Sequence, residues 1–229
     1  MSAPEPAALA WLLPLVRFAS PTLPVGAYAY SRGLEYACHA GWVHDEASAR
    51  DWLLGLLEHV GAQLDGPVLV RLQHAFVTED LAAVERWNEL LLASRESSEL
   101  RLEDTQLGAA LMRLLDSLGV PLAPLFLRRE DVGYATAFAL AMAHHAVPPS
   151  AALSAFLWAQ TETQASAAVR LVPLGQTAGQ RILSAVVAAL PAHVEHALGV
   201  PDDALGGFAP ALALASAWHE TQYTRLFRS

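Results

Sequence analysis

The chain has 229 residues, enough for one large domain with a core that needs no disulfide support. Its net charge of −9 argues against general binding to nucleic-acid phosphates, and its 14 basic residues are all arginine, which excludes a Schiff-base lysine and a P-loop lysine. The single cysteine, Cys38, cannot form an intrachain disulfide and suits a reducing, cytoplasmic compartment.

No sequence signal competes with helix. Period-2 alternation is scarce, hairpin dipeptides between β-branched runs are missing, and much of the 54% hydrophobic content is alanine, which helices tolerate well. We therefore predict an all-α fold, a single globular domain of about nine or ten helices spanning residues 1–229. The ends, 1–6 and 224–229, are predicted to be mobile when the chain is free. No apolar run of 18 residues is uninterrupted by Pro, His, Arg or Gln, so we predict no membrane span.

Apolar residues at helical spacing mark the predicted helices. Five have predicted bounds: 7–18, 27–40, 130–146, 150–170 and 208–226. The others are recognised by their apolar faces, which run from Trp52 to Val60, from Leu69 to Phe76, from Leu81 to Leu91, from Leu107 to Leu118 and from Ile182 to Leu190.

Start and stop signals divide these segments. Asp45 is predicted to cap one helix, and acids at Thr78-Glu79-Asp80 mark the start of another. Asp65-Gly66-Pro67 is predicted to end a helix and to begin the next. Ser94 to Asp104, with six charged residues in eleven, is predicted to be a solvated turn and the exposed start of a helix.

The stretch from Leu171 to Arg181 is predicted to be a stiff elbow between two helices. Pro173 cannot continue a regular helix, and Gly175 allows a turn that other residues resist. Thr177 is the predicted cap of the following helix. The backbone preferences of these residues, taken alone, favour a helix–helix connector over a recognition site.

No active site is legible from the residues. His193 and His196 stand at i, i+3, a spacing that can place two imidazoles on one ion, with Glu195 or Glu220 as further ligands. A helical metal-dependent enzyme using these residues is the alternative function that we keep open. Glu35 is a candidate general acid, although a lone carboxylate more often forms a salt bridge or a cap.

Separated stretches of the chain resemble one family. Residues 19–35 (ASPTLPVGAYAYSRGLE), 172–177 (VPLGQT) and 219–229 (HETQYTRLFRS) resemble three motifs of the UreF family of urease accessory proteins. The charged block Ala93-Ser94-Arg95-Glu96, followed by Glu99-Leu100-Arg101, matches in order and spacing.

This resemblance implies an all-α, dimeric, non-enzymatic protein without a resident cofactor. It implies binding to the accessory protein UreD (also called UreH), recruitment of the GTPase UreG, and docking on urease apoprotein for GTP-dependent nickel delivery. Nickel would pass through or beside such a protein as cargo.

The resemblance also implies which residues contact partners. Within the matching motifs these are Arg225, Leu226, Phe227, Gln176, Tyr30 and Glu35, and two residues before the second motif it is Arg170. Arg170 stands where the family motif usually has lysine. The positive charge is kept, but the hydrogen-bond geometry of lysine is lost, so a role that needs lysine is not expected here. Under this interpretation the elbow fixes the packing angle of two core helices and so shapes the docking surface.

Overall fold

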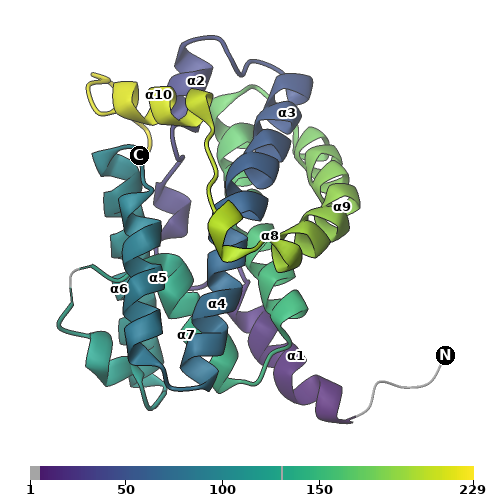
Figure 1. The fold of residues 1–229 in the computed structure, drawn as a ribbon. Coiled ribbons are helices and arrows are strands. Elements are labelled where there is room, and N and C mark those ends of the chain that lie inside the picture. Colours follow the sequence, from purple (N-terminus) through teal and green to yellow (C-terminus); the bar gives the residue numbers. More distant parts are fainter. Residues whose placement is uncertain (1–5, 130) are drawn as a thin grey trace.

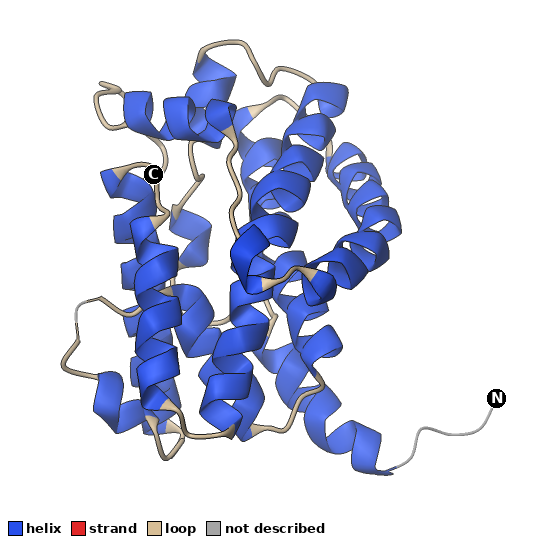
Figure 2. Cartoon of the chain, in the orientation of Figure 1, coloured by secondary structure: helices blue, strands red, loops and turns tan. Residues whose placement is uncertain are grey.

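The apolar stripes form helices throughout the part of the chain that the computed structural model describes, residues 6–129 and 131–229, and these residues contain no strand (Figures 1 and 2). The all-α prediction is therefore confirmed. Residues 1–5, in the predicted mobile N-terminal stretch, lie outside the described residues. In chain order the elements are α1 Pro6–Phe18, η1 Ala27–Ala29, α2 Leu34–His39, α3 Glu46–Leu56, η2 Leu57–Asp65, α4 Gly66–Val77, α5 Leu81–Ala93, α6 Ser98–Ser117, η3 Ala123–Phe126, α7 Tyr134–His144, α8 Pro149–Leu171, α9 Gln176–Gly199, η4 Asp202–Ala204 and α10 Pro210–His219.

Helices α4 and α7 form the centre of the core. All residues from Ala135 to Met142 on α7 are buried, as are Val68, Leu69 and Leu72 on α4. Each large apolar side chain buried in this way contributes about 1.5–3 kcal/mol. Helix α4 packs against α5, α7, α8 and α9, so the α8–α9 pair and the α5–α6 region are attached to one rigid centre.

The predicted stop at 65–67 is wrong, because the helix continues from α3 through η2 into α4. Pro67 cannot be accommodated in a regular α-helix interior without loss of a hydrogen bond. The chain resolves this with a π-helical segment, η2, in which the Gly66 N–H donates to the Gly61 carbonyl five residues earlier. A Cβ on Gly66 would lie 2.7 Å from Leu153 Cδ1 of α8, so glycine allows the close approach of α8 at this point.

The predicted helix 27–40 is also wrong, because it is split into η1 and α2. Arg32 and Gly33 have φ values of 52° and 76°, and two consecutive left-handed residues end any helix. A Cβ on Gly33 would lie 3.0 Å from the Ser216 backbone nitrogen, so α10 rests against the turn. This kink sets the direction in which α2 enters the functional region.

The elbow is confirmed as a connector, with two details corrected. Helix α8 ends at Leu171, Val172 is extended, and α9 begins at Gln176. Gly175 is the N-cap, with φ −73° and no side-chain cap bond, so the predicted cap by Thr177 is wrong. A φ of −73° suits any residue, and a Cβ on Gly175 would meet nothing within 4 Å. The elbow therefore does not depend on the conformational freedom of glycine.

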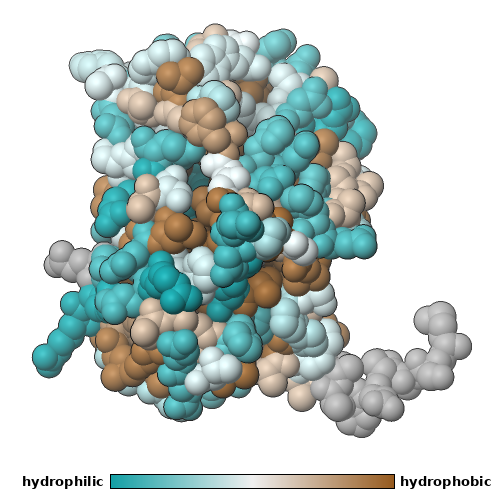
Figure 3. Space-filling model, in the orientation of Figure 1, coloured by the Kyte–Doolittle hydropathy of each residue, from teal (hydrophilic) through white to brown (hydrophobic). Residues whose placement is uncertain are grey.

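Helix α9 is the one helix in the described ranges that is long and apolar enough to cross a membrane, judged by length and composition alone. Only 22% of its apolar window is buried within the chain, and core helices of soluble proteins pass the same test. One such helix is weak evidence for a membrane span, and the absence of a membrane span stays a prediction. On the face shown in Figure 3, hydrophobic patches are interspersed with hydrophilic residues.

Candidate functional site

The C-terminal residues fold back over α2 and α6 instead of extending the last helix. Helix α10 ends at His219, so the predicted helical end at Leu226 is wrong. The Arg225 guanidinium donates to the carbonyl groups of Glu220 and Gln222, which closes a turn after α10. The segment 220–229, called the tail below, then runs beside the entry to α2 (Figure 1).

Glu35 on α2 holds the tail through its backbone. Its Oε1 accepts a hydrogen bond from the Leu226 N–H at 2.6 Å, and its Oε2 accepts one from the Phe227 N–H at 2.8 Å. The residue is 7% exposed, so the carboxylate is buried and replaces the helical acceptors that these two amides lack. The predicted partner residue Glu35 thus makes contacts within the chain.

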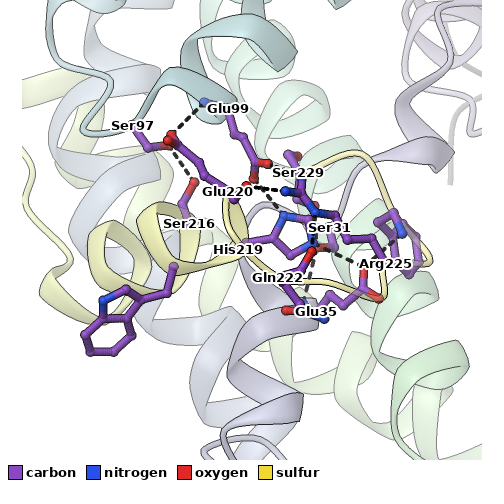
Figure 4. Close-up of polar contacts among 12 residues, drawn as sticks. Ser31, Glu35, Ser97, Glu99, Ser216, His219, Glu220, Gln222, Arg225 and Ser229 are labelled. Atoms are coloured by element: carbon purple, nitrogen blue, oxygen red, sulfur yellow. Dashed lines mark hydrogen bonds and ion pairs between the residues drawn. The ribbon is translucent and has the colours of Figure 1, made fainter.

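His219 lies between two carboxylates and has no solvent exposure. Its Nδ1 is 2.7 Å from Glu99 Oε2 on α6, and its Nε2 is 3.3 Å from Glu35 Oε2 on α2 (Figure 4). The ring therefore connects the end of α10 to both neighbouring helices. Its position follows the buried stripe of α10, which also carries Leu212, Ala215 and Ser216.

Arg225 is directed into the same cluster. Its Nη1 donates to Glu99 Oε1 at 2.7 Å, and its side chain is 32% exposed. Because this guanidinium is held by Glu99 and two carbonyl groups, its bonds in this arrangement stabilise the turn. A role for Arg225 in partner contact stays a prediction.

The next two tail residues point in opposite directions. Phe227 is 5% exposed, packs in a core cluster with Leu34 and Ala168, and lies under the Arg170 guanidinium at 4.7 Å from the ring centroid. Leu226 is 59% exposed. The tail is therefore anchored by Phe227 and presents Leu226, in the arrangement that the structure describes. Mobility of 224–229 in the free chain stays a prediction.

The other predicted partner residues do not gather at one point. Tyr30 is buried, whereas Gln176 is exposed at the start of α9, and Arg170 is exposed at the end of α8. Arg170 also donates to the Tyr28 carbonyl at 3.4 Å, which connects the N-terminal motif to the tail. Leu34 of the first motif and Val172 of the second belong to the same buried cluster as Phe227, so the three family-like motifs share one part of the core.

The prediction that the charged stretch 94–104 is solvated is wrong for Glu99, Glu103 and Asp104, which are buried, whereas Glu96 and Arg101 are exposed as predicted. Arg95 has a 6% exposed side chain and donates to Asp65 Oδ1 and Asp104 Oδ2, both at 2.8 Å. Ser229 Oγ donates to Glu103 Oε2 at 2.7 Å. Sequence reasoning missed this cluster because charge density alone does not show that the partners lie on other elements.

Burial and pairing shift the ionisation of this cluster in opposite directions. Burial alone would lower the pKa of Arg95, but Asp104 and Asp65 together raise that pKa above its usual value. Burial raises the pKa of Glu103, and Arg32 opposes this rise. These groups line a cavity of about 60 Å³ that also borders Gln164, whose buried Oε1 has no hydrogen-bond partner in the structure.

The metal-site alternative gains no support from the geometry. His193 is half-buried on α9, whereas Glu195 and His196 are exposed there. The Glu220 carboxylate instead accepts from the Ser98 N–H and Oγ at the start of α6. Within residues 6–129 and 131–229, no three His, Cys, Asp or Glu side chains are placed to hold one ion.

Comparison of the sequence with known proteins identifies the family of this chain. A family model described as UreF matches residues 43–187. The chain is 51% identical over 218 residues to urease accessory protein UreF 2 of Brucella anthropi, covering 95% of this chain and 96% of the relative. It is 49% identical over 210 residues to urease accessory protein UreF of Alkalilimnicola ehrlichii, covering 92% of each chain.

The chain belongs to the UreF family. Its role is therefore in urease maturation, as a urease accessory protein. The UreF model matches residues 43–187, and the alignments with these two relatives cover 95% and 92% of the chain. The sequence-based prediction that the chain resembles the UreF family is thereby confirmed.

Proposed function

We propose that this UreF-family chain is a non-catalytic urease maturation chaperone. Together with UreD (UreH) it recruits the GTPase UreG to urease apoprotein for GTP-dependent nickel insertion. It acts in the cytoplasm as a homodimer, and nickel is its cargo. Family membership and the motifs that carry the resemblance support this proposal.

The chemistry of the residues supports this division of labour. The chain has no lysine, so P-loop nucleotide hydrolysis belongs to a partner. The clustered ionisable groups of the described residues pair with one another, which is typical of a structural network. Such a protein acts through surfaces that it holds in a fixed arrangement.

The observation that carries the proposal is the form of the tail. Phe227 and the bonds to Glu35 fix the backbone from inside, while Leu226 is 59% exposed and Tyr223 is fully exposed. Large apolar groups held out on a fixed backbone are typical anchors for a protein partner. We therefore assign partner contact to Leu226 and assign the shaping of the surface to Phe227, Tyr30 and Glu35.

The test is co-purification with the UreD-type, UreG-type and apoprotein partners, with urease activation as a second measurement. Leu226→Asp should weaken complex formation by about 30-fold, the loss of a hot-spot residue worth about 2 kcal/mol. Its melting temperature should match that of the parent chain, because the side chain is exposed. Leu125→Asp is the matched control, since Leu125 is 57% exposed on η3 at the opposite end of α6.

Normal complex formation and activation by Leu226→Asp would contradict the tail assignment. Failure of the parent chain to bind any of the three partners would contradict the proposed function itself.

A further inference from the structure

One internal cavity belongs neither to the tail nor to the elbow. It has a volume of about 60 Å³ and lies between residues 18–27 and helices α6 and α8. Its wall is apolar over Phe18, Leu23 and Phe156, and the exposed Pro21 places it next to the surface. The side chains at its polar end are charged or carry an amide, and they are Arg32, Asp65, Arg95, Glu103, Asp104 and Gln164.

Several polar groups at this end of the cavity lack close partners. Arg32 Nε is 3.8 Å from Glu103 Oε1, and Arg32 Nη2 is 3.9 Å from Asp65 Oδ2, and both distances are too long for a hydrogen bond. Gln164 is 4% exposed, and its Oε1 has no hydrogen-bond partner among the described residues. Buried polar groups in proteins are nearly always paired with the protein or with a bound molecule. These groups therefore indicate that a molecule occupies the cavity.

The charges that line the cavity favour a neutral molecule over an ion. The guanidinium groups of Arg32 and Arg95 balance the carboxylates of Asp65 and Asp104. Burial raises the pKa of Glu103, which favours its neutral form, although Arg32 opposes this rise. An ion that entered such a balanced site would lose its hydration and find no counter-charge, whereas a neutral molecule would avoid this cost.

The groups without close partners include both hydrogen-bond donors and acceptors. Arg32 has N–H donors only, whereas Asp65 Oδ2 is an acceptor. Gln164 carries an amide, whose oxygen and nitrogen exchange places when the group rotates. A molecule with N–H donors and a carbonyl acceptor in one plane pairs with all three, and this is the chemistry of an amide or of urea. The volume equals that of about two water molecules at liquid density, which suits one molecule as small as acetamide or urea.

We propose that this cavity is a binding site for a small neutral molecule of the amide class, urea included. Arg32 donates to its carbonyl oxygen, and Asp65 and Gln164 accept its N–H groups. A second cavity of about 30 Å³ shares Arg32 and Gln164, but no carboxylate lines it, so the larger cavity is the site. This inference goes beyond the proposed function and does not depend on the role of the tail.

The experiment uses 19F NMR on the full chain labelled with 3-fluorotyrosine. Tyr134 lines the cavity and is the reporter, and Tyr134→Phe identifies its signal among those of the five tyrosines. The chain is titrated with acetamide and, separately, with urea at concentrations far below those that unfold proteins. The Tyr134 signal should shift and reach saturation with a dissociation constant of about 1 mM, because a molecule of so few atoms binds no tighter than tens of micromolar. Saturation by only one of the two molecules would support the proposal and distinguish an amide from urea.

Charged molecules of the same shape test whether the site selects a neutral ligand. Acetate matches acetamide but carries a negative charge, and guanidinium matches urea but carries a positive charge. Each ion should bind more than tenfold more weakly than its neutral counterpart. An ion that binds within tenfold of its counterpart, or tighter, would overturn the proposal. A Tyr134 signal that saturates with neither acetamide nor urea would overturn it as well, because the cavity would then hold only water.

A variant tests the amide at the polar end. Gln164→Met keeps the length of the side chain and removes its amide, so acetamide and urea should bind more than tenfold more weakly. Gln73→Met is the matched control, since Gln73 is buried, has an Oε1 without a partner among the described residues and does not line the cavity, and it should keep the parent affinity. Parent affinity in folded Gln164→Met would overturn the proposal. The comparison with the ions uses the parent chain, so the test holds even where Gln164→Met fails to fold.

Discussion

The elbow at 171–181 and the tail at 220–229 both carry family motifs, but they are built in different ways. The elbow has an ordinary backbone, an exposed Gln176 and an exposed ion pair between Arg181 and Glu46. The tail is held by a fully buried histidine, two buried carboxylates and a buried phenylalanine. A motif that marks the family therefore does not say whether its side chains contact a partner or each other.

The largest expected effect is at Arg95, in the buried charged cluster that binds the tail through Glu103 and Ser229. Arg95→Met would leave Asp65 and Asp104 buried without their cation, which typically costs about 3–5 kcal/mol. Urea denaturation should show this fall in the free energy of unfolding. Arg113→Met on the exposed face of α6 is the matched control, expected within about 0.5 kcal/mol of the parent. A comparable small loss for Arg95→Met would show that the cluster is hydrated and weakly coupled.

Much of the fold was predictable from local patterns. The apolar spacing in α4, α5 and α8 and the cap at Asp45, which receives the Ser48 N–H, are determined by residues close in sequence. Helix 27–40 failed because two left-handed residues at 32 and 33 are stabilised by α10, which is distant in sequence. Local propensity cannot register such a contact.

The site was predictable in its location and not in its chemistry. The motifs indicated the tail, but the sequence assigned no role to His219. Its partners Glu35 and Glu99 lie 184 and 120 residues away in sequence. The usable signal was its place on the buried stripe of α10, where a polar residue needs buried partners. Pairing over such separations appears only once the helices are packed.

Two glycines offer a sharper comparison of the regions. Gly33→Ala should destabilise the chain by about 1–2 kcal/mol, because Gly33 is left-handed and its new Cβ would lie 3.0 Å from the Ser216 nitrogen. Gly175→Ala should stay within about 0.5 kcal/mol of the parent, since its φ is ordinary and the space is open. Thermal unfolding of both variants provides the measurement. A larger loss of stability in Gly175→Ala than in Gly33→Ala would show that the elbow, and not the turn at Gly33, is the conformationally restricted region.

Cys38 gives the smallest effect, one on reactivity with no change in stability. Burial, followed by the charge of Glu35, raises the pKa of the Cys38 thiol to about 11. At pH 8 the thiolate fraction is then about two orders of magnitude below that of an ordinary thiol, so alkylation by iodoacetamide should be slower by that factor. The same chain unfolded in urea is the control and should react at the ordinary rate.

Because Glu35 also holds the tail, Glu35→Gln should speed alkylation of the folded chain, whereas Gln176→Glu at the elbow should leave the rate unchanged. Equal rates in the folded and unfolded chain would show that α2 opens readily, and the tail would then lack the fixed support that distinguishes it from the elbow.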